Sequence, residues 1–430
     1  MGSSPNDAVL ESARPFLRGE LEKIDPKLPS LIAVLKSVGA GECWHKHGSF
    51  LDHLIDIYKI LKLWKAPESV CLCGLFHSAY SNSYVNLAIF DPSTGRDVVR
   101  DHVGEAAESL IHLFCVVPRQ TLIHDDLLFK YSDRELVEHL GCSEASLRNA
   151  KEKGVFDGDE EWRKKVNGLV PENGVAVKHI SRQLFGFQDE LFCNHDGRLE
   201  FRGNNVAALW PGNGKPGLWM NSNSRMGAIF SLIVREEEIL MEERRRVSGS
   251  GLVLRKERDE DIELVVPPVF SFCTKETSLS KSSVSRFSVV VKGIIKLVVD
   301  SHIHVMDQVL DAKEQIEARE MYWEVVSSDI SKEGYLERAE EILLGCIEKN
   351  PFVGEPHVLL SQVYLGKKRF KEAEIEAEKG LLLLLQWGSP WDKRMSWEGW
   401  IAWVRVLLMK SQDQSWPDVS WGILNLGLVR

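Results

Sequence analysis

Two histidines, His53 and His77, are the residues of this sequence whose type and spacing could do chemistry. They stand 24 residues apart, and each belongs to a segment with helical character. An imidazole can bind a divalent metal ion or act as a general acid or base. It can also be an ordinary packed side chain, provided that its ring nitrogens find hydrogen-bond partners. Both interpretations of the pair stay open at this point.

Two predicted helices position these histidines. Across residues 50–64 apolar side chains recur every three or four positions, which predicts an amphipathic helix with Ser49 as its N-cap. A proline-containing break follows, and the second helix, residues 69–79, is apolar almost throughout. This composition predicts burial on all sides, so that His77 at its end needs a polar partner. Residues 8–37 predict one or two short helices that pack against the histidine segment.

The motif HLIDIYKIL, followed by GLFHS, resembles the HD superfamily and in particular the guanosine-tetraphosphate hydrolases. The resemblance implies a helical domain in which His53 and His77 hold one divalent ion, such as manganese, iron or zinc. Ser78 stands where that family has a ligand aspartate, and a serine hydroxyl brings no charge to the ion. The candidates for the last family ligand, an aspartate on a later helix, are Asp125, Asp126 and Asp189. The resemblance therefore implies the fold, while the serine argues against the family's activity.

The likeness extends beyond the histidines. Residues 98–117 resemble the next helix of the same family, including its glycine. The whole chain is similar to a mainly plant group of proteins that joins such a degenerate domain to a tetratricopeptide-like tail. That second resemblance implies an architecture and carries no activity with it.

Composition narrows the class of protein. The chain has 430 residues with 44% hydrophobic and 27% charged residues, which is typical of soluble globular domains. A formal charge of -10 disfavours nucleic-acid binding, because phosphate contacts require a basic face. No apolar stretch approaches the roughly 20 residues that a membrane-spanning helix needs. The eight cysteines form no CxxC pair, which indicates reduced thiols in a cytoplasmic or nuclear protein.

A loop rich in glycine, asparagine and tryptophan is predicted at residues 194–224. Its GNGKPG motif does not have the spacing of a phosphate-binding loop. The loop is either packed structure or a surface for a ligand or partner. The polar residues that would serve such a surface are His195, Asp196, Lys215 and Arg225. The charged helix that follows, residues 224–247, predicts a solvated face.

The last part of the chain carries a period of 34 residues. Trp323 and Ala339 match positions 4 and 20 of a tetratricopeptide repeat, and Tyr364 and Ala373 match positions 11 and 20 of the next. Trp397 and Trp400 share one face of a later predicted helix. Tryptophans of this kind either fill a core or form a partner surface, and the partner-binding candidates are Trp323, Tyr364, Trp397 and Trp400. The segment Asp392–Arg394 is interpreted as an exposed turn.

These patterns predict an all-α protein with an HD-like helical domain followed by a tetratricopeptide-like solenoid. We place the first domain at residues 1–247, a linker at 248–288 and the helical-repeat domain at 289–430, with residues 289–316 as a helix or helix pair. Two functions follow. One is a non-catalytic scaffold without a cofactor that binds a protein partner through its repeats. The alternative is a metal-dependent phosphohydrolase that uses His53 and His77 to activate a water molecule.

Overall fold

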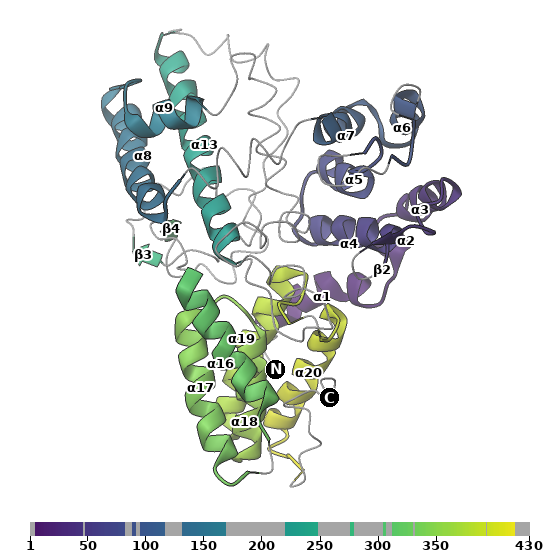
Figure 1. The fold of residues 1–430 in the computed structure, drawn as a ribbon, viewed down its shortest axis with the longest axis vertical. Coiled ribbons are helices and arrows are strands. Elements are labelled where there is room, and N and C mark those ends of the chain that lie inside the picture. Colours follow the sequence, from purple (N-terminus) through teal and green to yellow (C-terminus); the bar gives the residue numbers. More distant parts are fainter. Residues whose placement is uncertain are drawn as a thin grey trace. The chain divides into compact units, whose positions relative to one another are not determined.

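The computed structural model describes residues 5–45, 48–81, 88–91, 95–116, 131–168, 220–247, 276–278, 304–306, 312–329, 332–392 and 394–417. These residues are mainly helical, which confirms the predicted all-α fold class (Figure 1). The strands among the described residues form two short antiparallel pairs. Nowhere in this described part does a helix combine the length and apolar character needed to cross a bilayer. The chain divides into two compact units.

The unit that holds both histidines begins with a small helical bundle. Helix α4 packs against α5 and α3, and α7 packs against α5 and α6. The elements are α3 (Leu28–Ser37), β1 (Trp44–His45), β2 (Gly48–Ser49), α4 (Phe50–Leu63), α5 (Glu68–Phe76), α6 (Gly95–Val103) and α7 (Glu105–Val116). Every residue from Val70 to Phe76 is buried, so the prediction of a helix buried on all sides is confirmed. The core of this bundle includes Leu35, Leu54, Tyr58, Leu75, Phe76, Ile111 and Phe114.

One helix prediction in this bundle is wrong. Residues 98–117 were expected to form one helix, but α6 ends at Val103 and α7 begins at Glu105. Gly104 separates them with a φ of 84°, in the left-handed region that glycine adopts without steric cost. The chain can therefore change direction between the two helices.

The second part of this unit contains α8 (Asp133–Lys153), α9 (Glu161–Gly168) and α13 (Met220–Val247). Helix α8 is continuous over its 21 residues, from the N-cap Ser132 to the C-cap Gly154, which adopts the left-handed conformation. The solvated face predicted for residues 224–247 is wrong at one position. Glu236 is buried, and Arg163 Nε and Nη2 donate to its two carboxylate oxygens at 2.6 and 3.1 Å. One glutamate of the charged α13 sequence therefore forms a buried ion pair with α9.

Two strands lie in the region predicted to hold a linker and helices. They are β3 (Glu276–Ser278) and β4 (His304–Met306), which pair antiparallel. The helix prediction over residues 289–316 is therefore wrong at residues 304–306. Most of the predicted linker lies outside the described residues.

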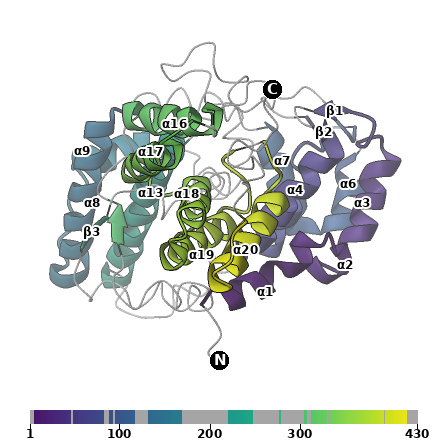
Figure 2. The same cartoon turned by 90° about the horizontal axis from the view of Figure 1, so that it is seen from below.

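In the other unit, helices α16 to α20 form a row in which each packs against the next, as Figure 2 shows. The elements of this unit are α1 (Pro5–Leu17), α2 (Leu21–Ile24), α16 (Ala312–Ser327), α17 (Tyr335–Lys349), α18 (Glu355–Gly366), α19 (Phe370–Trp387) and α20 (Trp397–Gln412). The expectation that residues 8–37 pack against the histidine segment is confirmed for α3, which contacts α4, and is wrong for α1, which packs against α19 and belongs to this unit.

Small residues let the row pack closely. Ala339 of α17 and Ala373 of α19, 34 residues apart, are both buried. Gly380 of α19 faces Gly354 at the start of α18, and a Cβ built on Gly380 would lie 3.1 Å from the carbonyl oxygen of Gly354. The backbones of α18 and α19 approach closely at this point because neither residue has a side chain. The helix pair predicted after residue 354 is thus present.

Candidate functional site

A capping box at the N-terminus of α4 holds the turn that carries His53. Ser49 caps this helix: its Oγ accepts from the amide of Asp52 at 3.1 Å, and the Asp52 carboxylate accepts from the Ser49 amide at 3.3 Å. This reciprocal pair satisfies two donors that the first turn leaves without intrahelical partners. His53 follows on the first turn of α4, half-buried. His77 is the C-cap of α5 and is completely buried.

The rings of His53 and His77 are packed against each other. Their centroids are 5.2 Å apart with an interplanar angle of 80°, and His77 makes a similar edge contact with Phe114 at 5.4 Å. His77 Nδ1 lies 2.7 Å from the carbonyl oxygen of Gly74. Because a carbonyl can only accept, Nδ1 is the donor, and this bond fixes the orientation of the ring. The two histidines that the resemblance assigns to one site therefore lie side by side in the structure.

The position after His77 has no carboxylate. Ser78 is completely buried, and the thiol of Cys115 donates to the carbonyl oxygen of His77 over 3.3 Å. Among the described residues no group of three His, Cys, Asp or Glu side chains could hold a metal ion. The proposed late ligands Asp125, Asp126 and Asp189 lie outside the described residues. The described donor set, two imidazoles and a hydroxyl, lacks the carboxylate of the ligand set that the sequence resemblance implies.

A buried carboxylate that sequence reasoning missed lies in the same bundle. Glu108 of α7 is fully buried, and Arg96 Nε and Nη2 donate to its two oxygens at 2.7 and 2.8 Å. The hydroxyl of Tyr80 donates to the same carboxylate at 3.0 Å. Burial alone would raise the pKa of Glu108, but the hydrogen bonds from Arg96 and Tyr80 and the charges of Arg96 and Arg100 hold it below its ordinary value. This group ties α6 to α7 and to the segment after α5.

The four aromatic residues predicted to bind a partner are not equally accessible. The indoles of Trp397 and Trp400 are buried, and their Nε1 atoms donate to the carbonyl oxygens of Leu384 at 2.6 Å and Asp392 at 2.9 Å. Tyr364 is also buried, with the guanidinium of Arg369 4.3 Å from its ring centre. Trp323 is the one of the four that stays half-buried. The arrangement assigns Trp397 and Trp400 to the core of the helical row.

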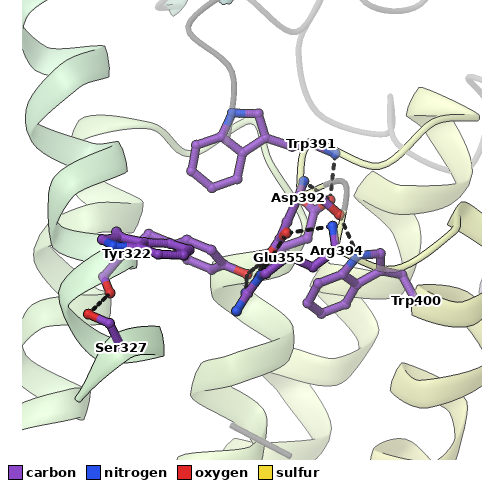
Figure 3. Close-up of polar contacts among 8 residues, drawn as sticks. Tyr322, Ser327, Glu355, Trp391, Asp392, Arg394 and Trp400 are labelled. Carbon is purple, nitrogen blue, oxygen red and sulfur yellow. Dashed lines mark hydrogen bonds and ion pairs between the residues drawn. The ribbon is translucent and has the colours of Figure 1, made fainter. Parts of the chain in front are cut away.

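The interpretation of the segment Asp392–Arg394 as an exposed turn is wrong at Asp392 and Arg394, and Lys393 lies outside the described residues. Figure 3 shows Asp392 and Arg394 beside Tyr322 and Glu355, inside the row of helices. The Asp392 residue is 1% exposed, and the side chain of Arg394 is 3% exposed. We call residues 388–396, which join α19 to α20, the Trp391 turn. A run of Asp, Lys and Arg is usually exposed, so the composition of the turn led to the wrong prediction. The tryptophans around it were the signal that could have indicated burial.

Hydrogen bonds hold the Trp391 turn from two sides (Figure 3). Glu355 Oε1 accepts from the backbone amides of Trp391 at 2.6 Å and Asp392 at 3.1 Å. Tyr322 donates its hydroxyl hydrogen to Asp392 Oδ2 at 2.6 Å, and Arg394 Nε lies 2.9 Å from both oxygens of Asp392. The turn thus joins α16 and α18 to the last described helix.

The loop predicted at residues 194–224 lies outside the described residues except at its end, where residues 220–224 begin α13 and the loop prediction is wrong. His195, Asp196 and Lys215 lie outside the described residues. Arg225 is on α13, but its side chain is not described. The prediction of a ligand or partner surface at this loop stays a prediction.

Comparison with known proteins adds one finding. A family model described as a domain of unknown function (DUF6817) matches residues 34–119, the part that contains α4 to α7 and both histidines. No curated protein and no solved structure matches the chain. The chain is therefore similar to that domain of unknown function over the histidine bundle.

Proposed function

We propose that the protein is a non-catalytic interaction protein, in which a degenerate HD-like bundle and a tetratricopeptide-like helical row form a scaffold for a protein partner. The observation that carries this proposal is the buried Ser78 next to His77. A hydrolase that resembles this bundle would need a charged oxygen there to offset the dehydration of its ion. The ring of His77 is held in place by its contact with Phe114 and by the hydrogen bond from its Nδ1 to the carbonyl oxygen of Gly74.

The partner surface that fits this proposal is on α20. Val406 and Met409 are 38% and 48% exposed, and Ala402 is exposed on the same face. Residues three and four apart on a helix are neighbours, so these three form one apolar stripe. Arg405 is exposed beside it. This chemistry suits an amphipathic partner helix that carries acidic residues along its apolar face.

An affinity experiment with the full chain tests the proposal. The wild type is compared with the double variant Val406→Glu/Met409→Glu and with Leu344→Glu, a control on α17, where Leu344 is 47% exposed. We expect one defined protein to be recovered by the wild type and the control and lost with the double variant. Circular dichroism checks that all three chains have the same helical content. Equal recovery by all three would exclude α20 as the partner surface.

The alternative, a metal-dependent phosphohydrolase, is favoured by one distance, the 5.2 Å between the rings of His53 and His77. Metal analysis of protein purified without chelator tests it, with His53→Gln as the test variant. His102→Gln is the matched control, because His102 is exposed on α6. Stoichiometric manganese, iron or zinc that is lost only in His53→Gln, together with turnover of a phosphate ester, would overturn the scaffold proposal. Equal metal content in the wild type and in both variants would support the scaffold proposal.

A further inference from the structure

Two buried carboxyl groups meet one buried guanidinium at the Trp391 turn: Asp392 and Arg394 belong to the turn, and Glu355 comes from α18. Arg394 forms an ion pair with Asp392: its Nε lies 2.9 Å from both carboxylate oxygens, and its Nη2 also donates to one of them. Tyr322 adds a hydroxyl donor to the same carboxylate. Asp392 is therefore satisfied as an anion.

Glu355 is placed differently. It is 1% exposed, and its carboxyl accepts hydrogen bonds from the backbone amides of Trp391 and Asp392 and from its own backbone amide. Amide donors stabilise a carboxylate only in part, and the negative charge of Asp392 opposes ionisation. If both carboxyls were ionised, the group of Glu355, Asp392 and Arg394 would carry one more negative than positive charge. A buried surplus charge is costly, and the group can avoid this cost by keeping its proton.

We propose that Glu355 is a proton-gated latch on the Trp391 turn: the turn stays docked while this carboxyl carries a proton and opens more readily once the proton has left. Opening exposes Glu355 to water, where the carboxylate is well solvated, and separates it from Asp392. The latch acts within the row of helices and does not depend on any partner.

The titratable groups around Glu355 support this assignment. From the turn they are Asp392 and Arg394, and from α16 it is Tyr322. On α18 itself, His357 turns to Glu376 of α19, with Nδ1 2.5 Å from the carboxylate. Burial, and next the charge of Asp392, raises the pKa of Glu355 from 4.5 to about 7, although its amide hydrogen bonds act in the opposite direction. The proton is thus lost in the range where cells regulate pH.

Hydrogen exchange at the amides of Trp391 and Asp392, which both donate to Glu355, measures the opening. A carboxyl with a pKa of about 7 when docked and 4.5 when open makes opening about tenfold more favourable at pH 8 than at pH 6. We expect this rise, after correction for the intrinsic exchange rate, in the wild type and in Glu348→Gln, a control at an exposed position of α17. Glu355→Gln keeps an acceptor oxygen but cannot ionise, so its protection should be independent of pH.

Two results would overturn the latch: equal corrected protection at pH 6 and pH 8 in the wild type, or a tenfold change that persists in Glu355→Gln. A second measurement applies if Glu355→Gln does not fold. The infrared band of a protonated carboxylic acid in the wild type should be present at pH 6 and fade towards pH 8. Absence of this band at pH 6 would show an ionised Glu355 and refute the proposal.

Discussion

Replacing Gly380 by alanine tests the close approach of α18 and α19. A Cβ on this residue would lie 2.9 Å from Val358 Cγ2, 3.1 Å from the carbonyl oxygen of Gly354 and 3.2 Å from the amide nitrogen of Val358. Two of these three atoms belong to the backbone of α18 and the residue before it, so they cannot rotate away. The two helices would have to separate, which loosens the packing along the row.

The expected loss of stability comes from two opposing effects. Alanine is favoured over glycine inside a helix by about 1 kcal/mol. Overpacking a filled site costs about 1–3 kcal/mol, and contact with rigid backbone puts this position in the upper part of that range. We therefore expect Gly380→Ala to lower the free energy of unfolding by about 1–2 kcal/mol.

Equilibrium unfolding in urea, followed by tryptophan fluorescence, measures this difference, because many tryptophans of the chain lie in the helical row. Gly345→Ala on α17 is the control. Its Cβ would meet the terminal methyl group of Met321 at 2.5 Å, and a flexible methionine end can move aside. The control should be as stable as the wild type or more stable, by up to about 1 kcal/mol. A Gly380→Ala variant whose urea midpoint equals or exceeds that of the wild type would refute the reasoning.

Three further substitutions probe the histidine unit. Glu108→Gln removes the anion that pairs with Arg96. Because the pKa of Glu108 is lower in the folded chain than in the unfolded chain, ionised Glu108 stabilises the fold at pH values above its ordinary pKa. This stabilisation is lost as the pH falls through the pKa that Glu108 has in the folded chain. The wild type should therefore lose stability more steeply than the variant on acidification, as thermal unfolding at pH 3 to 7 would show. Gly154→Ala places a side chain at φ 65° and against Arg246, and should cost about 1–2 kcal/mol in urea unfolding. Ser49→Ala removes the N-cap of α4 and should cost about 1 kcal/mol by the same measurement; an unchanged midpoint would contradict the capping geometry.

Local patterns predicted the elements that position the histidines. The N-cap at Ser49 and the apolar run of α5 depend on residues that are close in the chain, and the structure confirms both. The same approach failed where one residue changes the backbone direction. Gly104 divides a segment with continuous helical periodicity, because periodicity does not report the sign of φ.

In the candidate site, too, some features could be predicted from the sequence and others could not. The sequence placed His53 and His77 in adjacent helices, and their ring contact followed from helix packing. It did not reveal the partners of buried charges such as Glu108 and Glu236, because these pairs join helices that are separate in the chain.

By itself, the sequence determined the all-α class, the helices around the histidines and the spacing of small residues in the tail. Only the tertiary structure decided which charged residues are buried and which tryptophans are accessible. The Trp391 turn is the clearest case. Its composition predicts that its charged residues are exposed, yet Asp392 and Arg394 are enclosed by Tyr322 and Glu355. The physical reason is that burial and pairing depend on contacts between distant segments, whereas periodicity and capping are properties of a few consecutive residues.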